Sequence, residues 1–312
     1  MQANCKTISE EIFAIRRLAY GVLDWKYHSP GVMPPALMAL RGYGLLRSHS
    51  GRLMSHGSVC GIGYGQQAFT LSDVTAPPVK DVTYAGFGGV VLSLDPCKGG
   101  RDKGGRASDF HSRTIICRDR KFLNPKSIEG LKRVGLVDRE FENRFEVYGS
   151  DQTEARARIT PDFMERLMQF DDDYLGRNIQ CGFVGGKLHI CLEIDDRFDF
   201  NRMHLVDNYT ALSAIVLHEL AAVFTVLELG QRLQNTIGVQ TDETMDAQRG
   251  VYYASQLQTI TAALETPPEN WRHVSKTGSN ERYPNFLFDG YLGQMIKPVF
   301  MPLSQSWDKP KS

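Results

Sequence analysis

The chain has 312 residues, which is enough for one large domain or two ordinary ones, each with a proper hydrophobic core. Hydrophobic residues make up 42% and charged residues 23% of it, values that exclude disordered, collagen-like and coiled-coil classes. Lysines plus arginines and aspartates plus glutamates number 36 each, so the net charge is zero. This balance removes the global electrostatic argument for a nucleic-acid partner.

The start of the chain and its cysteines indicate the compartment. The sequence MQANCKTISEEIF lacks the basic and then apolar pattern of a signal peptide. No CxxC pair occurs among the six cysteines, which are Cys5, Cys60, Cys97, Cys117, Cys181 and Cys191. We therefore expect reduced thiols in a cytoplasmic protein, with no metal site and no cofactor.

Residues 1–50 are predicted to form a helical N-terminal segment. Apolar residues recur at helical spacing between Thr7 and Leu23, and Thr7 with Glu10 has the spacing of a capping box. We expect the apolar face of this helix to contact a partner through Ile8, Ile12 and Ile15. Attachment of residues 8–23 to a membrane surface stays an alternative, although the polar side of this helix mixes acids with arginines.

Short β-prone runs separated by glycine and proline follow from Gly51 to about Arg120, and they predict strands. The run GIGYG (61–65) leads into the strand-like AFTLSDV. A dinucleotide-binding loop would open a helix at this point, so turn glycines are the expectation.

The stretch 98–121 is basic, with eight lysines and arginines against three aspartates, and the glycines of its first part predict a mobile loop over 97–113. It does not match a P-loop, because Gly105 follows Gly104 and no Lys-Ser or Lys-Thr pair comes after it. Spaced arginines can bind phosphate groups, so the candidate anion-binding residues are Arg101, Lys103, Arg106 and Arg113. A solvated loop is the alternative. Cys97, beside Lys98, is the candidate for a reactive thiol.

The region 140–194 has the clearest pattern. A short strand is predicted at Phe145–Tyr148, and Asp151 with Glu154 has the spacing of a helix cap, which explains both acids without chemistry. Thr160, Pro161 and Asp162 suit a helix start. The acidic run Asp171–Asp173 is expected to be a solvated turn.

Alternating apolar residues on both sides of Gly185-Gly186 predict a β-hairpin. A two-residue turn makes the numbers of paired residues sum to 371, so Cys181 lies opposite Ile190. Cys191 then lies opposite Gln180, on the other face of the sheet, and this excludes a Cys181–Cys191 disulfide.

The run 208–233 is apolar on nearly all sides, which predicts a helix packed in a core or against a second subunit. His218-Glu219 near its centre lacks the second histidine of a zinc-protease motif, so we interpret it as a satisfied core pair. These polar residues also argue against a membrane span.

Residues 238–312 hold a predicted helix over 241–264 and then an aromatic tail. Such a tail is expected to dock onto a partner protein or onto this chain. Its candidate contact residues are Trp271, Tyr283, Phe286, Phe288, Tyr291, Phe300 and Trp307.

Several stretches together resemble a bacterial family of domains of unknown function, number 3137. They are Phe141-Glu142, RFEVYGSDQTEARARITPDFMERL (144–167), FVGGKLHICL (183–192) and DRFDF (196–200). With the upstream runs FGGVVLSLD and RTIICRD, the resemblance extends over about 57–233. It implies a fold and no catalytic residues, since the family has no established activity.

The predicted fold is α+β, a mostly antiparallel sheet with packed helices and with helical N-terminal and aromatic C-terminal extensions. The predicted division is 1–50, 51–237 and 238–312. The preferred function is a non-enzymatic cytoplasmic module that binds a protein, either a second copy or another chain. The alternatives are a binder or enzyme for an anionic small molecule at 98–120 and a peripheral membrane protein.

Overall fold

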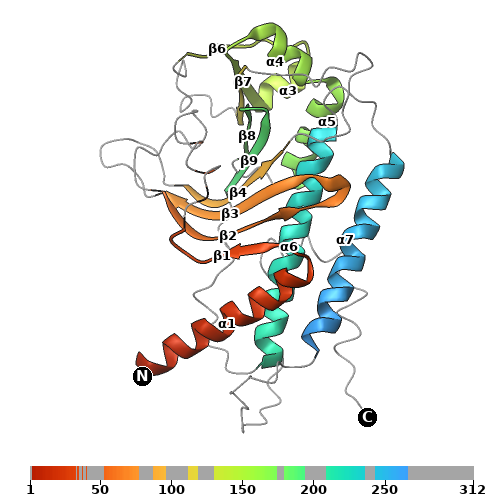
Figure 1. The fold of residues 1–312 in the computed structure, drawn as a ribbon. Helices are drawn as coiled ribbons and strands as arrows, with labels where there is room; N and C mark the ends of the chain where they lie inside the picture. Colours follow the sequence, from red (N-terminus) through yellow and green to blue (C-terminus); the bar gives the residue numbers. More distant parts are fainter. Residues whose placement is uncertain are drawn as a thin grey trace. The chain divides into compact units, whose positions relative to one another are not determined.

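The structure is a computed structural model that describes residues 2–32, 34, 37, 40, 53–76, 87–95, 112–118, 130–173, 179–193, 209–235 and 243–265. These residues form a nine-stranded sheet and helices (Figure 1), which confirms the predicted α+β class.

The sheet is antiparallel and its strands follow the order β1-β2-β3-β4-β9-β8-β5-β7-β6. Strand bounds are β1 Lys26–His28, β2 Met54–Ile62, β3 Ala68–Ala76, β4 Phe87–Leu94, β5 Thr114–Arg118, β6 Lys132–Arg133, β7 Phe145–Gly149, β8 Ile179–Val184 and β9 Lys187–Glu193. The β8–β9 hairpin has therefore been placed between β4 and β5, two strands that are neighbours in sequence.

Both predicted turns are confirmed. In the β8–β9 hairpin Cys181 lies opposite Ile190 and Gln180 opposite Cys191, in the predicted register. Gly185 and Gly186 form the turn with φ of 58° and 75°, angles that suit glycine. Gly65 has φ of 69° in the turn between β2 and β3.

Of the three helices whose start the sequence predicts from a cap signal, two begin at that signal. Their bounds are α1 Gln2–Val22, α3 Arg139–Arg144, α4 Gln152–Arg158, α5 Pro161–Asp173, α6 Tyr209–Asn235 and α7 Glu243–Leu264. Asp151 caps α4 by accepting from the Glu154 N–H at 2.9 Å, and the Thr160 hydroxyl accepts from the Phe163 N–H at 3.2 Å. The exception is α1, which begins at Gln2 and not at Thr7.

The chain forms two compact units. One contains residues 27–197 and 227–247, and the other contains residues 1–26, 198–226 and 248–312. The second unit joins segments from both ends of the chain, whereas the sequence analysis divides the chain into three consecutive segments. Helix α6 contributes residues to each unit.

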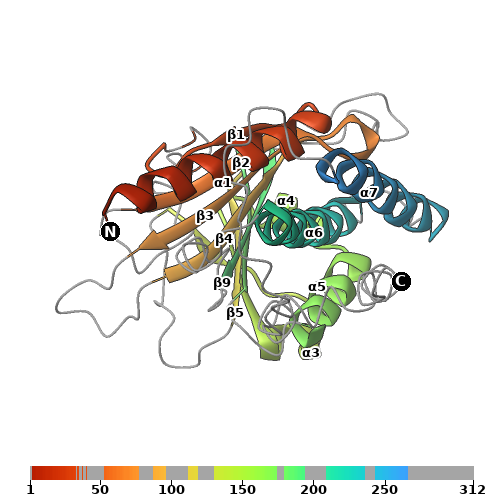
Figure 2. The same cartoon turned by 90° about the horizontal axis from the view of Figure 1, so that it is seen from below.

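In the unit that contains the sheet, helices cover one face of the strands (Figure 2). Phe163 of α5 packs against Phe183 of β8, with ring centroids 5.7 Å apart. The end of α6 lies over β4 and β9, since a Cβ on Gly230 would be 2.4 Å from a Leu92 methyl. On the other face, Val91 and Cys191 belong to a second buried cluster with Leu37, Leu40 and Leu53.

The other unit is organised around a buried ion pair between α1 and α6. Arg16 donates to Glu219 at 2.9 Å, and the Tyr20 hydroxyl donates to the same carboxylate at 2.7 Å. Arg16 is 2% and Glu219 6% exposed. Glu219 is therefore a satisfied core residue, as predicted, with Arg16 as its partner.

In the acidic run at the end of α5, Asp171 is not solvated as expected, whereas Asp172 is 64% exposed. Asp171 is 2% exposed and accepts from Arg118 at 2.6 Å, while Asp172 accepts from Arg144 at 2.6 Å. Burial raises the pKa of Asp171 above its ordinary value, and the charge of Arg118 acts against that rise. These aspartates tie α5 to β5 and α3.

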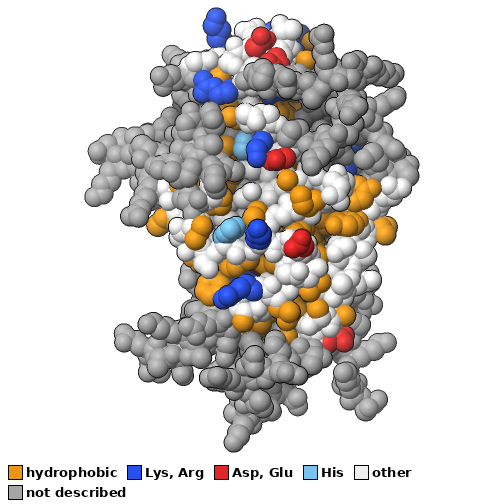
Figure 3. Space-filling model, in the orientation of Figure 1, with side chains coloured by type: hydrophobic (Ala, Val, Ile, Leu, Met, Phe, Trp, Pro, Cys, Tyr) orange, Lys and Arg blue, Asp and Glu red, His pale blue; other side chains and the backbone are white. Residues whose placement is uncertain are grey.

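Side chains of α4 protect the edge of the sheet at β6. Arg156 Nε donates to the Gly135 carbonyl at 3.1 Å, and Gln152 donates to the Arg133 carbonyl at 3.4 Å. Carbonyls at a sheet edge are otherwise open to an incoming strand. Basic and acidic side chains gather over β6 and α4 at the top of Figure 3.

Candidate anion-binding site

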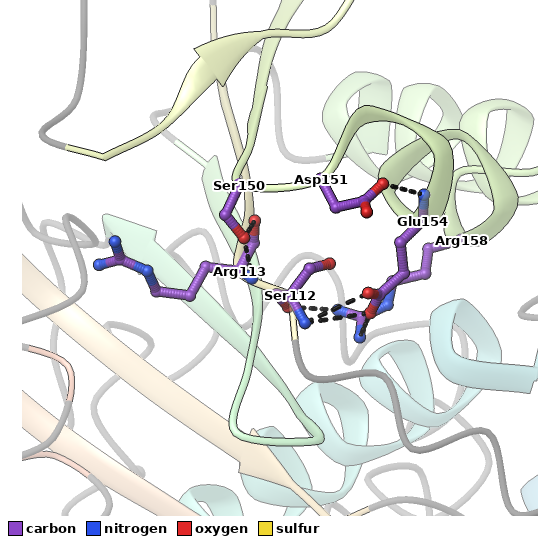
Figure 4. Close-up of polar contacts among 6 residues, drawn as sticks. All are labelled: Ser112, Arg113, Ser150, Asp151, Glu154 and Arg158. Atoms are coloured by element: carbon purple, nitrogen blue, oxygen red, sulfur yellow. Dashed lines mark hydrogen bonds and ion pairs between the residues drawn. The ribbon is translucent and has the colours of Figure 1, made fainter.

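The described end of the basic loop is held where β5 begins. Ser112 and Arg113 are the first described residues after residues 96–111, and both contact the segment 150–158 (Figure 4). Arg113 is the one candidate anion-binding residue that falls within the described part of the chain.

The backbone N–H and the backbone carbonyl of Arg113 both form hydrogen bonds with Ser150. The Arg113 N–H donates to Ser150 Oγ at 2.9 Å, and the Ser150 N–H donates to the Arg113 carbonyl at 2.9 Å. This pairing extends the β5–β7 ladder, in which Thr114 lies opposite Gly149. The strand pair therefore fixes the backbone at Arg113.

The backbone of Ser112 is fixed by two side chains of α4. Its N–H donates to both oxygens of Glu154, at 3.2 and 3.3 Å. Arg158 Nη1 donates to its carbonyl at 3.1 Å, and Arg158 also pairs with Glu154 at 2.5 Å. We call Ser112, Arg113, Ser150, Glu154 and Arg158 the loop anchor.

Arg158 is the buried centre of the loop anchor. It is 2% exposed and its guanidinium lies 5.4 Å from the centre of the Phe183 ring, a cation–π distance. Burial lowers the pKa of Arg158, and the paired Glu154 acts in the opposite direction. An arginine remains charged under these conditions, so Glu154 is needed as its counter-ion.

The capping explanation of the two acids is thus half right. Asp151 caps α4, as expected, and the Glu154 carboxylate instead binds Arg158 and the Ser112 N–H. Spacing along the chain could not reveal this role, because Ser112 lies 42 residues before Glu154.

The side chain of Arg113 points away from the loop anchor (Figure 4). It is partly exposed, and within the described ranges its guanidinium has no hydrogen bond or ion pair. The guanidinium lies close to Gly130, where a Cβ would be 3.0 Å from Nη2. A cation on a fixed backbone with no acidic partner in the described structure is suited to an external anion.

Two buried hydroxyls belong to the residues on either side of Arg113 in the sequence. Ser112 is 9% and Thr114 0% exposed, and neither hydroxyl oxygen has a hydrogen-bond partner among the described residues. A buried hydroxyl without a partner is costly and is normally bonded to water or to a ligand. These two therefore add unused polar groups close to Arg113.

The remaining candidate residues are only partly described. Arg101, Lys103, Arg106 and Cys97 lie outside the described residues, as do Trp271, Tyr283, Phe286, Phe288, Tyr291, Phe300 and Trp307 and the side chain of Ile8. The other two apolar candidates on α1, Ile12 and Ile15, are 6% and 1% exposed. Both of these side chains are therefore buried.

Two further features bear on the class of site. The described residues include no group of three or more histidine, cysteine, aspartate or glutamate side chains placed to hold a metal ion. Among them, only α6 contains a stretch, Leu212–Gln234, that is long and apolar enough to cross a membrane, and 72% of the tested window is buried inside the protein. Glu219, which is buried and pairs with Arg16 of α1, lies within that stretch.

Comparison with known families confirms the resemblance found in the sequence, over a shorter span than the expected 57–233. Residues 106–229 match the family model described as protein of unknown function, DUF3137. The loop anchor lies inside the matched segment, whereas β1 to β4 precede it. No curated protein and no solved structure matches the chain.

Proposed function

We propose that the protein is a non-enzymatic cytoplasmic interaction module that binds an anionic group of its partner beside the loop anchor. Arg113 is the described contact residue. Arg101, Lys103 and Arg106 are the further contacts that the sequence adds. The recognised chemistry is a carboxylate or a phosphate group, presented by a protein segment or by a small molecule.

One observation carries this proposal. Ser150, Glu154 and Arg158 bind the backbone polar groups of Ser112 and Arg113, while the Arg113 guanidinium has no acidic partner in the described ranges. Because the backbone of Arg113 is already fixed, binding a carboxylate or phosphate there does not require ordering of that backbone. The internal acid, Glu154, is already occupied by Arg158.

A reducing compartment is also supported by the described thiols. Cys60, Cys117, Cys181 and Cys191 are not in disulfides. Cys181 and Cys191 lie on opposite faces of the β8–β9 hairpin, so they cannot pair without rebuilding the sheet.

The test is a titration of the purified full chain at low salt with two probes, pyrophosphate and a short polyglutamate peptide. Arg113→Gln should weaken binding of the preferred probe by roughly tenfold or more, the effect expected for one charge-assisted hydrogen bond. Preference for pyrophosphate indicates a phosphate ligand, and preference for the peptide indicates an acidic protein segment.

Arg17→Gln is the matched control, because it removes the same charge from an exposed position on α1 in the other unit. It should leave both affinities unchanged. If both substitutions weaken probe binding equally, the effect comes from the net charge of the chain and not from Arg113. If the unaltered chain binds neither pyrophosphate nor the peptide, the proposal is refuted.

A further inference from the structure

A thiol and an imidazole meet on the first two strands of the sheet. Cys60 of β2 and His28 of β1 come from positions 32 residues apart, and His28 Nε2 lies 3.3 Å from Cys60 Sγ. Both side chains are partly exposed, so a small reagent can reach the pair. Cys97 is the reactive thiol expected from the sequence, and this pair could not be found there, because its base, His28, lies 32 residues before Cys60.

The other described cysteines lie in a different environment. Cys117, Cys181 and Cys191 are 6%, 1% and 0% exposed. Burial raises the pKa of the Cys181 thiol, and it raises that of Cys191 to about 12. A buried thiol that cannot ionise is a poor nucleophile.

We propose that Cys60 is a site of thiol modification in which His28 acts as the base. With its proton on Nδ1, His28 accepts the thiol proton at Nε2 and leaves a thiolate, the reactive form of cysteine. The class of co-reactant is a peroxide. This site is independent of the loop anchor, whose residues lie next to β5 and β7 and in α4.

The reaction balances as a two-electron oxidation of sulfur. The Cys60 thiolate attacks one peroxide oxygen, the S–O bond forms and the O–O bond breaks. The leaving hydroxide takes the proton held by His28, and water departs. Cys60 is then a sulfenic acid and His28 is neutral again.

The environment supplies a matched control. The other titratable side chains of β1 and β2 are Lys26, Tyr27 and His56. His56 bonds to the Thr75 hydroxyl at 2.7 Å. Substitution of His56 therefore removes an imidazole from the same strand pair without removing the base proposed for Cys60.

The experiment measures alkylation of each cysteine of the folded full chain by iodoacetamide, with the rates read from the modified peptides by mass spectrometry. At pH 7 we expect Cys60 to react at least tenfold faster than Cys117, Cys181 and Cys191. His28→Gln should slow Cys60 by about tenfold, whereas His56→Gln should not. At pH 10 the unaltered and His28→Gln rates should converge, because a solvated thiol ionises there without a base.

Hydrogen peroxide with a sulfenic-acid trap should then label Cys60 in the unaltered chain and label it less in His28→Gln. Equal Cys60 rates in these two chains at pH 7 would overturn the role of His28. If His28→Gln does not fold, the test uses the alkylation rates of the unaltered chain. A Cys60 rate no faster than the rates of the three buried thiols would then overturn the proposed site.

Discussion

Glu219 is the most consequential single charge in the described structure. It lies in the middle of an apolar helix, and its carboxylate is bonded to Arg16 and Tyr20 from α1. A buried ion pair adds little net stability, but removal of one partner leaves the other charge buried and alone. The pair therefore makes the docking of α1 specific.

Glu219→Gln should lower the free energy of unfolding by about 3–5 kcal/mol, because Arg16 then stays buried without a counter-ion. Urea denaturation followed by circular dichroism measures this. Glu228→Gln is the control, since Glu228 pairs with Arg232 at a more exposed place and should cost less than about 1 kcal/mol. Similar costs for the two variants would contradict the burial argument.

His189 should make the fold sensitive to acid. Its Nδ1 bonds to the Ser93 hydroxyl at 2.8 Å, and burial lowers the pKa of His189 from 6.5 to about 4. Between these values the unfolded chain binds more protons than the folded chain, so stability falls as the pH drops through this window. The total loss is on the order of 3 kcal/mol.

His189→Gln keeps a polar group beside Ser93 and removes the titration. Urea unfolding at pH 7, 6, 5 and 4.5 should give a flatter pH dependence for the variant than for the unaltered chain. His218, whose pKa burial also lowers, is present in both chains and cancels in the comparison. Parallel curves would show that His189 does not titrate in this window.

At the scale of elements, the β4–β9 pairing depends on a glycine. A Cβ at Gly89 would lie 1.9 Å from the backbone carbonyl oxygen of Leu192, a distance that no side chain can relieve by moving. Gly89 and Leu192 are on adjacent strands at the centre of the sheet. Close approach of backbones explains why this strand begins Phe-Gly-Gly.

Gly89→Ala should destabilise the protein by about 3 kcal/mol, since the two strands must separate to admit the methyl group. Gly21→Ala is the control, because its Cβ would meet nothing within 4 Å and alanine favours a helix. In thermal unfolding, the midpoint temperature should be lower for Gly89→Ala than for the unaltered chain. For Gly21→Ala it should be unchanged or higher. Equal midpoints would contradict the close approach.

Elements with local signals were predictable and their partners were not. Asp151 and Thr160 mark helix starts through contacts three residues away, so their roles can be predicted from spacing. Glu154 and Asp171 are bonded to residues 42 and 53 positions earlier. Only the folded chain brings such partners together, and for this reason Asp171 was wrongly expected in solvent.

At the scale of the whole molecule, the sheet order predicts that the segment matched by the family model does not fold by itself. The matched residues 106–229 contain β5 to β9 but not β4, the neighbour of β9. They also end just before Gly230, which packs over Leu92, Leu94 and Ile190. The sequence predicted the hairpin register but could not predict that β9 pairs with a strand outside the family match.

A fragment of residues 106–229 should therefore aggregate and show rapid hydrogen exchange along β9, because an unpaired apolar edge is exposed. A fragment of residues 1–235 restores β4 and the end of α6, and it keeps Arg16 as the partner of Glu219. Its β8 and β9 amides should exchange slowly, as in the full chain. Slow exchange of β9 in the shorter fragment would contradict this dependence on β4.

The protection of the β6 edge by Gln152 and Arg156 has a consequence for self-assembly. A strand from another molecule could extend the sheet there only by displacing both side chains from the carbonyls of Arg133 and Gly135. Those side chains belong to the same helix that supplies Glu154 and Arg158. Strand addition at this edge would therefore disturb side chains of the same helix that fixes the backbone of Ser112.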